Sequence, residues 1–391
     1  MSLKIDFVER ASRKGVRMTS LCREFGISRE TGYKWLHRFR QEGYEGLEEQ
    51  SRRPSSHPMA TAEEVVMAVL KLREAHPRWG PKKLVELLRG RFKQQAPSRA
   101  TVARILHRFG QVRKRRHKAP VSVVDRAPVV DAKRPNEVWT VDFKGWWRSG
   151  DGTRCEPLTV RDNHSRYLLA AKLLPSTNVE AVRRVFEELF RRYGVPDAIQ
   201  CDNGQPFISV QSRGGLTRLS AWWVSLGISI VRSRLACPQD NGGHERMHRD
   251  LKADVQSQAV GTRLRTQRAL DRWRQEFNHV RPHEALHGKT PASIYRPGKR
   301  RALRPRMWPY PAGWTVKRAF GPKGCLSING EDVHISRAVI GHVLGVEPIG
   351  PHRARVWLHD VELGEVQVAP PAATIDAACL RFTMRAKKRS A

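Results

Sequence analysis

The first third of the chain carries hydrophobic residues at a helical period, interrupted by turn-forming residues. The pattern predicts a short helix, a turn at Gly26 and a second helix capped by Ser28. We expect the buried stripe of that second helix to consist of Tyr33, Leu36 and Phe39. Two capped helices joined by a glycine turn are typical of a helix-turn-helix.

A second unit of the same kind follows. Thr61-Ala62-Glu63-Glu64 fits a capping box at the start of one helix, and Pro81 suits the first turn of the next. Pro97-Ser98 then begins a third helix. The residues expected to face inward on it are Val102, Ile105, Leu106 and Phe109. The front of the chain is therefore predicted to be all-α, with two helix-turn-helix units in tandem.

From residue 135 the pattern becomes strand-like and then alternates between strands and helices. The predicted strands are 137–143, 158–162, 167–174, 198–201 and 228–232, and the predicted helices are 178–193, 216–226 and one from about residue 239. Three strands followed by helix, strand, helix, strand and helix is the order of the α/β ribonuclease-H-like fold. That fold has a mixed sheet with helices on both faces.

The helical pattern stops after Gly298. Short strand-like runs follow at 315–319, 325–328, 332–335, 354–358 and 365–368. Their spacing predicts a small C-terminal all-β barrel. Contact with DNA, contact with a second subunit and a passive cap are alternatives that the sequence leaves open for it.

These patterns divide the chain into a series of domains. In order they are a helix-turn-helix domain (1–50), a linker (51–60), a second helix-turn-helix domain (61–118), a linker (119–134), the α/β core (135–298), a basic hinge (299–312) and the β-barrel domain (313–391).

The net charge of the chain limits the classes of function it can have. The 391 residues include 72 Lys and Arg against 38 Asp and Glu, a formal net charge of +34, and the sequence pI is about 11.0. The first 134 residues alone hold 31 of the basic and 14 of the acidic residues. Solubility needs a net charge of only about 2–8 for a small domain. The excess argues against an ordinary metabolic enzyme and favours a polyanionic partner, of which nucleic acid is the commonest.

Basic side chains on the helix-turn-helix units are the candidate DNA contacts, because a recognition helix enters the major groove while Lys and Arg meet phosphates. The candidates are Arg29, Lys34 and Arg38 in the first unit, Arg52 and Arg53 in the linker, Arg99, Arg104 and Arg108 in the second unit, and the run Arg113, Lys114, Arg115 and Arg116. For each unit the alternative is a helical hairpin with a solvated basic face, and for the linker arginines a plain spacer.

Cysteine usage and hydropathy exclude other classes. The six cysteines are far apart and form no C-x-x-C pair, so neither a disulfide framework nor a thiolate zinc site is indicated. No apolar run approaches 18 residues, and the first twenty residues lack the apolar segment of a secretion signal. We therefore expect a soluble intracellular protein with no membrane partner.

Three carboxylates carry the candidate chemistry. Asp142 lies inside an apolar strand, where a carboxylate is costly unless it is paired or binds a metal. Asp202 is expected at the C-terminal end of a strand, where α/β sheets bind ligands. Glu245 lies on the later helix and shares a polar face with Arg249 and Lys252, two further candidate DNA contacts. Taken alone, each of these carboxylates is more readily explained as a structural residue than as a catalytic one. Together, three carboxylates can hold two magnesium ions for in-line displacement at phosphorus.

In these motifs and their order, the chain resembles the DDE transposases of bacterial insertion sequences, which have a retroviral-integrase-like core. The residues that carry the resemblance are Trp139-Thr140-Val141-Asp142, Cys201-Asp202-Asn203-Gly204-Gln205-Pro206-Phe207, Pro238-Gln239-Asp240-Asn241-Gly242-Gly243-His244-Glu245-Arg246, and Glu276 to Leu286 followed by Pro291 to Tyr295. The family's tandem helix-turn-helix front matches as well. The chain departs from the pattern of this family in two ways. It has 42 residues between Asp202 and Glu245, whereas many relatives have about 35. It also lacks the zinc-binding His/Cys module found at the start of retroviral integrases.

The resemblance implies a catalytic and metal-binding triad of Asp142, Asp202 and Glu245, with two Mg²⁺ or Mn²⁺ ions per active site. It implies a transposase, a polynucleotidyl transferase that binds the terminal inverted repeats of its element, cleaves DNA and transfers the strand. It further implies double-stranded DNA as partner, a homodimer or higher homo-oligomer on DNA, a bacterial cytoplasmic, nucleoid-associated location, and a C-terminal barrel of SH3-like type.

Two other functions are weighed against this one. His244-Glu245-Arg246-Met247-His248 satisfies H-E-x-x-H, the zinc-protease motif. The Asn-Gly-Gly turn directly upstream is too close for a long helix to carry both histidines deep in a cleft, which argues against zinc. No third histidine follows at metzincin spacing either. The second alternative is a DNA-binding regulator whose core has lost activity, because intact carboxylates do not prove catalysis.

Overall fold

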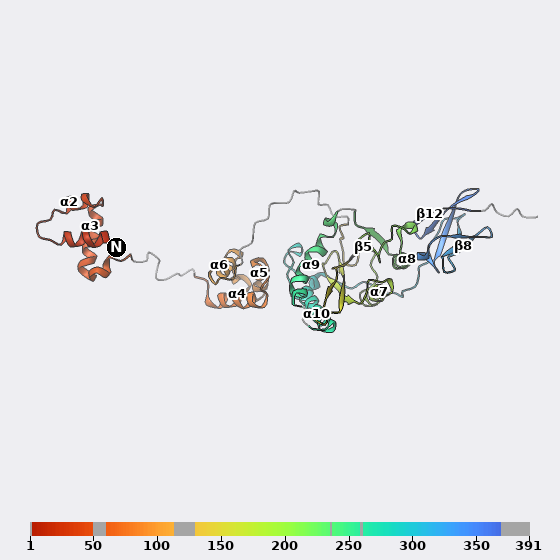
Figure 1. Cartoon of the computed structure of the whole chain (residues 1–391), viewed down its shortest axis with the longest axis horizontal. Coiled ribbons are helices and arrows are strands. Elements are labelled where there is room, and N and C mark those ends of the chain that lie inside the picture. Colours follow the sequence, from red (N-terminus) through yellow and green to blue (C-terminus); the bar gives the residue numbers. More distant parts are fainter. Residues whose placement is uncertain (1, 50–59, 113–129, 235–236, 259–260, 369–391) are drawn as a thin grey trace, which may run out of the picture. The chain divides into compact units, whose positions relative to one another are not determined.

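The computed structural model describes residues 2–49, 60–112, 130–234, 237–258 and 261–368 (Figure 1). The chain forms two compact units, residues 1–66 and 67–391. The candidate DNA contacts Arg52, Arg53 and Arg113 to Arg116 lie outside the described residues.

The first unit is a helix-turn-helix built on three helices. They are α1 (Ser2–Ala11), α2 (Met18–Glu24) and α3 (Arg29–Glu42), followed by the 3₁₀ turn η1 (Gly43–Leu47). Gly26 turns the chain between α2 and α3 with a φ of +63°, and Ser28 Oγ accepts the N–H of Thr31 at 3.1 Å. Both features agree with the sequence analysis, which did not predict α1.

The buried side of α3 differs from the predicted stripe. Leu36 is buried and Phe39 is partly buried, but Tyr33 is 57 % exposed. Trp35 takes the inner place instead and meets Phe7 of α1 edge to face, with ring centroids 5.6 Å apart. Residues spaced by three shift by about 60° per step around a helix, so Tyr33, Leu36 and Phe39 do not all lie on one face. The sequence analysis did not predict α1, and this helix determines which side of α3 is covered.

The second helix-turn-helix consists of α4 (Glu63–Ala75), α5 (Pro81–Phe92) and α6 (Arg99–Arg108). Ser98 caps α6 by accepting the N–H of Thr101 at 3.1 Å. Val102, Ile105 and Leu106 are buried as predicted, whereas Phe109 is 48 % exposed. Phe109 is the C-cap residue, where the backbone has left the helical conformation, so the helical period no longer fixes its direction.

The core is a mixed sheet of six strands. They are β1 (Val138–Phe143), β2 (Trp147–Arg148), β3 (Arg154–Asp162), β4 (Leu168–Leu174), β5 (Ala198–Cys201) and β6 (Ser229–Arg232). The order is β2-β3-β1-β5-β6, with β4 also paired to β3. β1, β3 and β4 pair antiparallel, whereas β5 runs parallel to both β1 and β6. This is the strand order of the predicted ribonuclease-H-like fold, whose short β2 the sequence analysis missed.

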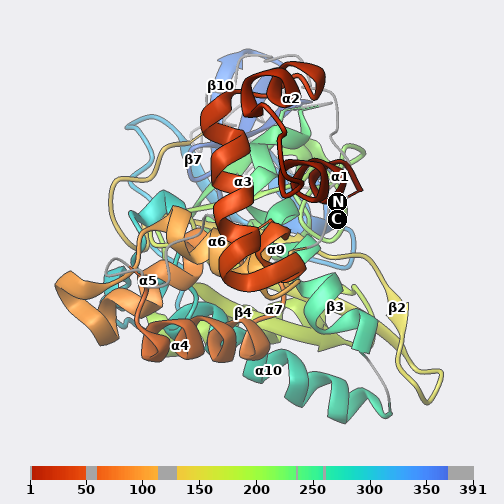
Figure 2. The same cartoon turned by 90° about the vertical axis from the view of Figure 1, so that its left-hand side faces the viewer.

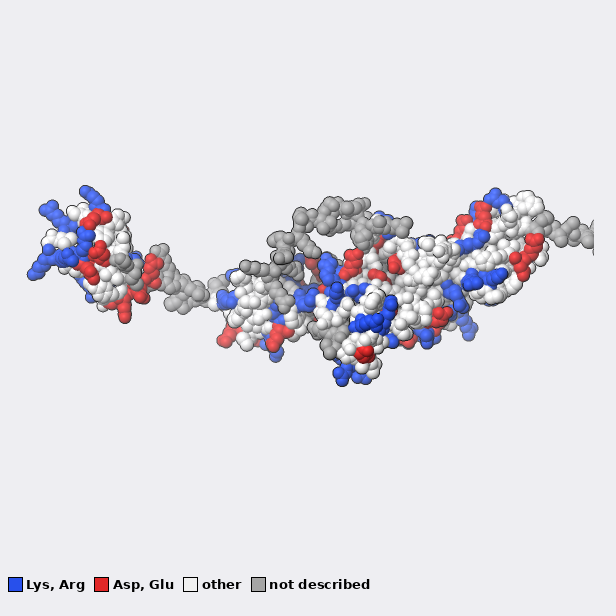
Figure 3. Space-filling model, viewed as in Figure 1, with Lys and Arg blue, Asp and Glu red and all other residues white. Residues whose placement is uncertain are grey.

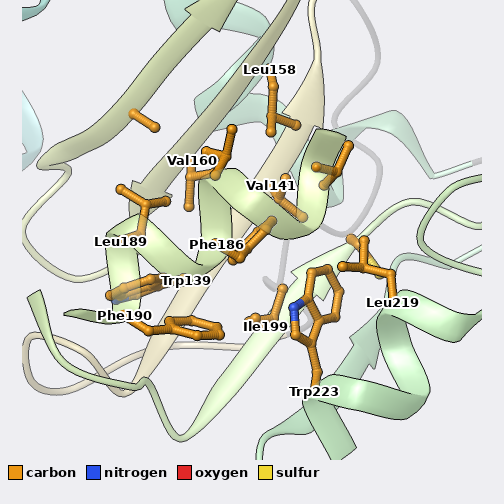
Figure 4. Packing of buried hydrophobic residues seen from close by; sticks show 14 of the residues in the cluster. Trp139, Val141, Leu158, Val160, Phe186, Leu189, Phe190, Ile199, Leu219 and Trp223 are labelled. Atoms are coloured by element: carbon orange, nitrogen blue, oxygen red, sulfur yellow. The ribbon is translucent and has the colours of Figure 1, made fainter. Parts of the chain in front are cut away.

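Helices cover both faces of this sheet. On one face, α7 (Val179–Tyr193) and α8 (Arg218–Ser225) pack on β1 residues Trp139 and Val141, and Figure 4 shows Phe186, Phe190 and Trp223 closing around them. On the other face lie α9 (Gly242–Asp254) and α10 (Arg263–His279). In Figure 2, α10 lies alongside β4, where Asn278 Oδ1 accepts the N–H of Leu168 at 2.8 Å.

Arg281, which follows α10, contacts the core and the second helix-turn-helix. Its guanidinium donates to Asp250 and Asp254 of α9 at 2.8 and 2.9 Å, and only 3 % of the side chain is exposed. It also lies 5.6 Å from the ring centroids of Trp79 and Trp273. Arg78 pairs with Asp254 at 3.2 Å. A buried cation therefore bridges the loop between α4 and α5 to the C-terminal half of α9.

The described residues of the C-terminal region form strands and one 3₁₀ turn, η7 (Arg337–Val339), and the sheets are not closed. β7 (Thr315–Arg318), β10 (Val343–Gly350), β11 (Arg353–Leu358) and β12 (Val361–Gln367) form a four-stranded sheet in the order β12-β11-β10-β7. β8 (Cys325–Ile328) and β9 (Glu331–His334) form a separate hairpin. The predicted barrel is thus not confirmed. Ala221 and Val224 of α8, and Leu216 two residues before the helix, join the hydrophobic core of these strands.

Candidate active site

Asp142 stands near the end of β1 on the face that α9 covers. Strand alternation places Thr140 and Asp142 on this face, opposite to Trp139 and Val141. Asn241, which precedes α9, donates its side-chain N–H to Asp142 Oδ2 at 2.9 Å. The side chain of Asp142 is 21 % exposed, so it is half-buried and open on one side.

Asp202 follows β5 directly, at the start of the turn that leaves the strand. Gly204 donates its backbone N–H to Asp202 Oδ1 at 3.4 Å, and the residue is exposed. Because β5 pairs parallel with β1, the C-terminal ends of both strands lie at the same edge of the sheet. Two aspartates are therefore presented side by side, as the sequence analysis expected.

Glu245 lies in the first turn of α9 and is exposed. Arg249 and Lys252 are exposed on the same helix, whereas Met247 and Leu251 are buried against the sheet. The predicted division of this helix into a polar and an apolar face agrees with the structure.

The electrostatics of Asp142 show that the three carboxylates act on one another. Burial raises the pKa of Asp142 to about 7, and the negative charges of Asp202 and Glu245 contribute to the rise. Burial also raises the pKa of Asp202. Two neighbouring carboxylates with raised pKa values and a third within range of their field form a site that favours a positive charge.

The donor chemistry fits a divalent ion, because carboxylate oxygens are the ligands that Mg²⁺ prefers. Within the described residues, no group of three or more His, Cys, Asp or Glu side chains is already gathered closely enough to hold a metal ion. The three carboxylates therefore have the right oxygen donors and a shared field but do not form a closed cage.

The two histidines of the H-E-x-x-H motif point away from Glu245, into the sheet. His248 Nε2 lies 2.8 Å from Thr159 Oγ1, and His244 Nε2 lies 3.4 Å from Thr140 Oγ1. Both rings are buried and stack with centroids 5.5 Å apart. The helix does carry both histidines on one buried face, contrary to the sequence argument, but their hydrogen-bond partners there are threonines. His248 Nδ1 also lies 3.9 Å from Asp142 Oδ2.

The sequence analysis assigned no role to Asn241 and considered His248 only as part of the zinc motif. Asn241 donates to Asp142 Oδ2, and His248 Nδ1 lies 3.9 Å from the same oxygen. The signal that could have indicated both is their closeness in sequence to Glu245, four residues before it and three residues after it.

The candidate DNA contacts that the structure describes lie at the surface. Arg29 and Lys34 on α3, Arg99, Arg104 and Arg108 on α6, and Arg249 and Lys252 on α9 are exposed, and Arg38 is half-buried. Figure 3 shows Lys and Arg side chains over the first unit and around α9 and α10. No helix in the described part of the chain is long and apolar enough to cross a membrane.

Comparison with known families agrees with this architecture. A helix-turn-helix domain model matches residues 3–55 and a homeodomain-like domain model matches residues 31–106. Two integrase core domain models match residues 132–238 and 226–291. The chain therefore joins helix-turn-helix domains, which imply DNA binding, to an integrase core, which implies a divalent metal ion.

Two relatives of the chain are proteins of bacterial insertion elements. The chain is 23 % identical over 251 residues to an insertion element IS476 protein of Xanthomonas euvesicatoria, a match that covers 64 % of this chain and 69 % of the relative. It is 26 % identical over 194 residues to an insertion element IS407 protein of Burkholderia multivorans, covering 49 % and 67 %. A Gag-Pol polyprotein of koala retrovirus is 30 % identical over 132 residues, covering 33 % of this chain and 7 % of the polyprotein.

Among solved structures, the catalytic core domain of HTLV-2 integrase in complex with magnesium aligns with a TM-score of 0.34 at 16 % identity. That alignment covers 42 % of this chain and all of the integrase domain. The family matches and the insertion-element relatives confirm the resemblance to insertion-sequence transposases. The function of the chain is DNA integration and transposition, with the polynucleotidyl transferase activity of an integrase core.

Proposed function

We propose that Asp142, Asp202 and Glu245 are the catalytic and metal-binding residues of this transposase. The observation that carries the proposal is the parallel pairing of β1 with β5, which presents Asp142 and Asp202 at one sheet edge, together with the hydrogen bond that ties Asn241, at the start of the helix of Glu245, to Asp142. The raised pKa of Asp142 agrees with it. A pair of Mg²⁺ or Mn²⁺ ions held by these oxygens would activate the attacking hydroxyl and stabilise the leaving oxygen at phosphorus.

The protein's own residues position this centre. Asn241 donates to Oδ2 of Asp142, and β1 and β5 fix the two aspartates at one sheet edge. His248 is held by Thr159 and packs beside Asp142. Arg249 and Lys252, exposed on the helix that carries Glu245, would meet the phosphates of bound DNA.

The helix-turn-helix units supply recognition in this proposal. They bind the terminal inverted repeats of the element through α3 and α6, with the candidate basic residues on phosphates and base edges. Two element ends are handled together, so a homodimer or higher homo-oligomer forms on DNA. In this proposal the C-terminal strands form an SH3-like domain whose open sheet packs on α8. The protein acts in the bacterial cytoplasm on nucleoid DNA.

The test is Asp142→Asn. The amide is a poor ligand for magnesium, so we expect cleavage and joining of end DNA to fall below a few per cent of wild type while a gel shift with the same DNA is unchanged. Retained activity would place the catalytic strand elsewhere. If wild-type protein binds end DNA but neither cleaves nor joins it with Mg²⁺ or Mn²⁺, the chain is a DNA-binding regulator instead.

A further inference from the structure

A buried arginine lies beneath the start of α9, and within the described part of the chain its guanidinium has no hydrogen-bond acceptor. Arg161 is on β3, opposite Thr140 of β1, and is 5 % exposed. Its Nε is buried with no partner, and no described residue accepts a hydrogen bond from, or forms an ion pair with, its guanidinium. A buried charge without a partner is costly, so its retention needs an explanation.

The guanidinium occupies the space that a side chain at position 243 would fill. A Cβ on Gly243 would lie 2.2 Å from Arg161 Nη2 and 2.5 Å from Nη1. Gly243 is the second residue of α9, which has 13 residues, and the N-cap Asn241 makes no side-chain hydrogen bond to the helix end. The side chain of Asn241 is turned toward Asp142 instead.

The surroundings add positive charge. The N-terminus of a helix carries the positive end of its macrodipole. Burial lowers the pKa of Arg161 to about 9, and the positive charge of Arg166 contributes to the shift. The charge of Arg246 in turn contributes to a lowered pKa of Arg166. The nearest opposing carboxylate, Asp162, is already engaged by the backbone N–H of Asn136 and by Ser165.

We propose that Arg161 and the N-terminus of α9 form a binding site for a backbone phosphate of the DNA in the active site. A phosphodiester supplies the negative charge and the acceptor oxygens that the guanidinium lacks, and helix N-termini bind phosphate through their free N–H groups. Glu245 lies in the same helical turn, so this site fixes the DNA strand next to the carboxylate centre. The inference rests on the proposed function and names the group of the substrate that this part of the site holds.

The first test separates an anion site from a structural arginine. Arg161→Met removes the charge but keeps much of the volume. In chloride we expect the variant to melt at the same temperature as wild type or higher, because an unpaired buried charge is lost. Inorganic phosphate at constant ionic strength should raise the melting temperature of wild type, but not that of Arg161→Met or of Gly243→Ala, whose Cβ would displace the guanidinium.

The second test uses the DNA reaction. At subsaturating DNA, joining by Arg161→Met and Gly243→Ala should fall about 10-fold, as expected for one lost charge-assisted hydrogen bond. Arg161→Lys should recover part of it. Arg191→Met, which removes the same charge from the exposed side of α7, should stay within about twofold of wild type.

Two results would overturn the inference. One is a phosphate-induced rise in melting temperature that is equal in wild type and Arg161→Met. The other is an Arg161→Met protein that unfolds at a lower temperature in chloride while Gly243→Ala joins DNA normally. If wild type joins no DNA, the proposed catalytic function fails, whereas the phosphate-dependent melting still decides the anion site separately.

Discussion

His283 and His342 are held in their neutral forms by burial. Burial lowers the pKa of His283 to about 3 and that of His342 to about 4, and neighbouring positive charges add to both shifts. Their unfolded pKa is near 6.5. Because the folded pKa values are lower, the stability from these groups is complete above pH 6.5 and is lost as the pH falls toward 3–4.

We therefore expect the melting temperature to drop between pH 7 and pH 5, with each histidine contributing up to about 1.4 kcal/mol per pH unit. His283→Gln, which cannot become charged, should show a shallower decline. Thermal unfolding across this pH range checks the expectation, and an identical pH dependence in wild type and His283→Gln would contradict it.

At the scale of elements, the two recognition helices depend on their serine caps. Ser28 and Ser98 each accept a backbone N–H three residues on, at 3.1 Å. Replacing either with Ala should cost about 1 kcal/mol of the stability of its unit. Ser28→Asp keeps an acceptor and should unfold close to wild type. If Ser28→Asp were as destabilised as Ser28→Ala in thermal melts, the cap would not be the cause.

Most core elements were predictable because their side chains alternate or repeat clearly. The places of two carboxylates in the fold were predictable too, because Asp142 interrupts an apolar strand and Asp202 follows one. The catalytic role of the triad stays a prediction. What failed depended on partners distant in sequence. Tyr33 was assigned inward because α1 was missing, and Gly32, whose Cβ would lie 2.7 Å from Cys22 Sγ, marks the side of α3 that α1 and α2 cover. No local pattern reports such a contact.

The C-terminal strands show the same limit. Strand spacing predicted a barrel, but the open sheet shares its hydrophobic core with α8. The loop before α8 also contacts the sheet, with Arg213 Nη1 donating to Glu365 O at 2.8 Å. Covering the apolar face of a sheet with a helix buries hydrophobic area, as closing the sheet into a barrel would. The strand pattern in the sequence is the same in both cases, so it cannot distinguish them.

For the whole molecule, a net charge of +34 predicts that DNA binding responds steeply to salt. A protein that neutralises 6–10 phosphates loses roughly 10³–10⁵ in affinity between 50 and 200 mM salt. We expect full-length protein to behave in this way on end DNA, measured by fluorescence anisotropy. The double variant Arg29→Ala, Lys34→Ala should bind more weakly and with a shallower salt dependence. Affinity that barely changes over this range would contradict a phosphate-dominated interface.

Glu245 distinguishes the two metal hypotheses most directly, because a zinc site and a magnesium site would give it different roles within one helix. The deciding measurement is strand transfer of end DNA with Mg²⁺ or Mn²⁺ by Glu245→Gln, with Glu188→Gln as a matched change of an exposed glutamate on α7. The account predicts that Glu245→Gln binds end DNA normally but loses at least 100-fold in strand transfer, while Glu188→Gln transfers strands as wild type does. Strand transfer by Glu245→Gln at wild-type rate would contradict it.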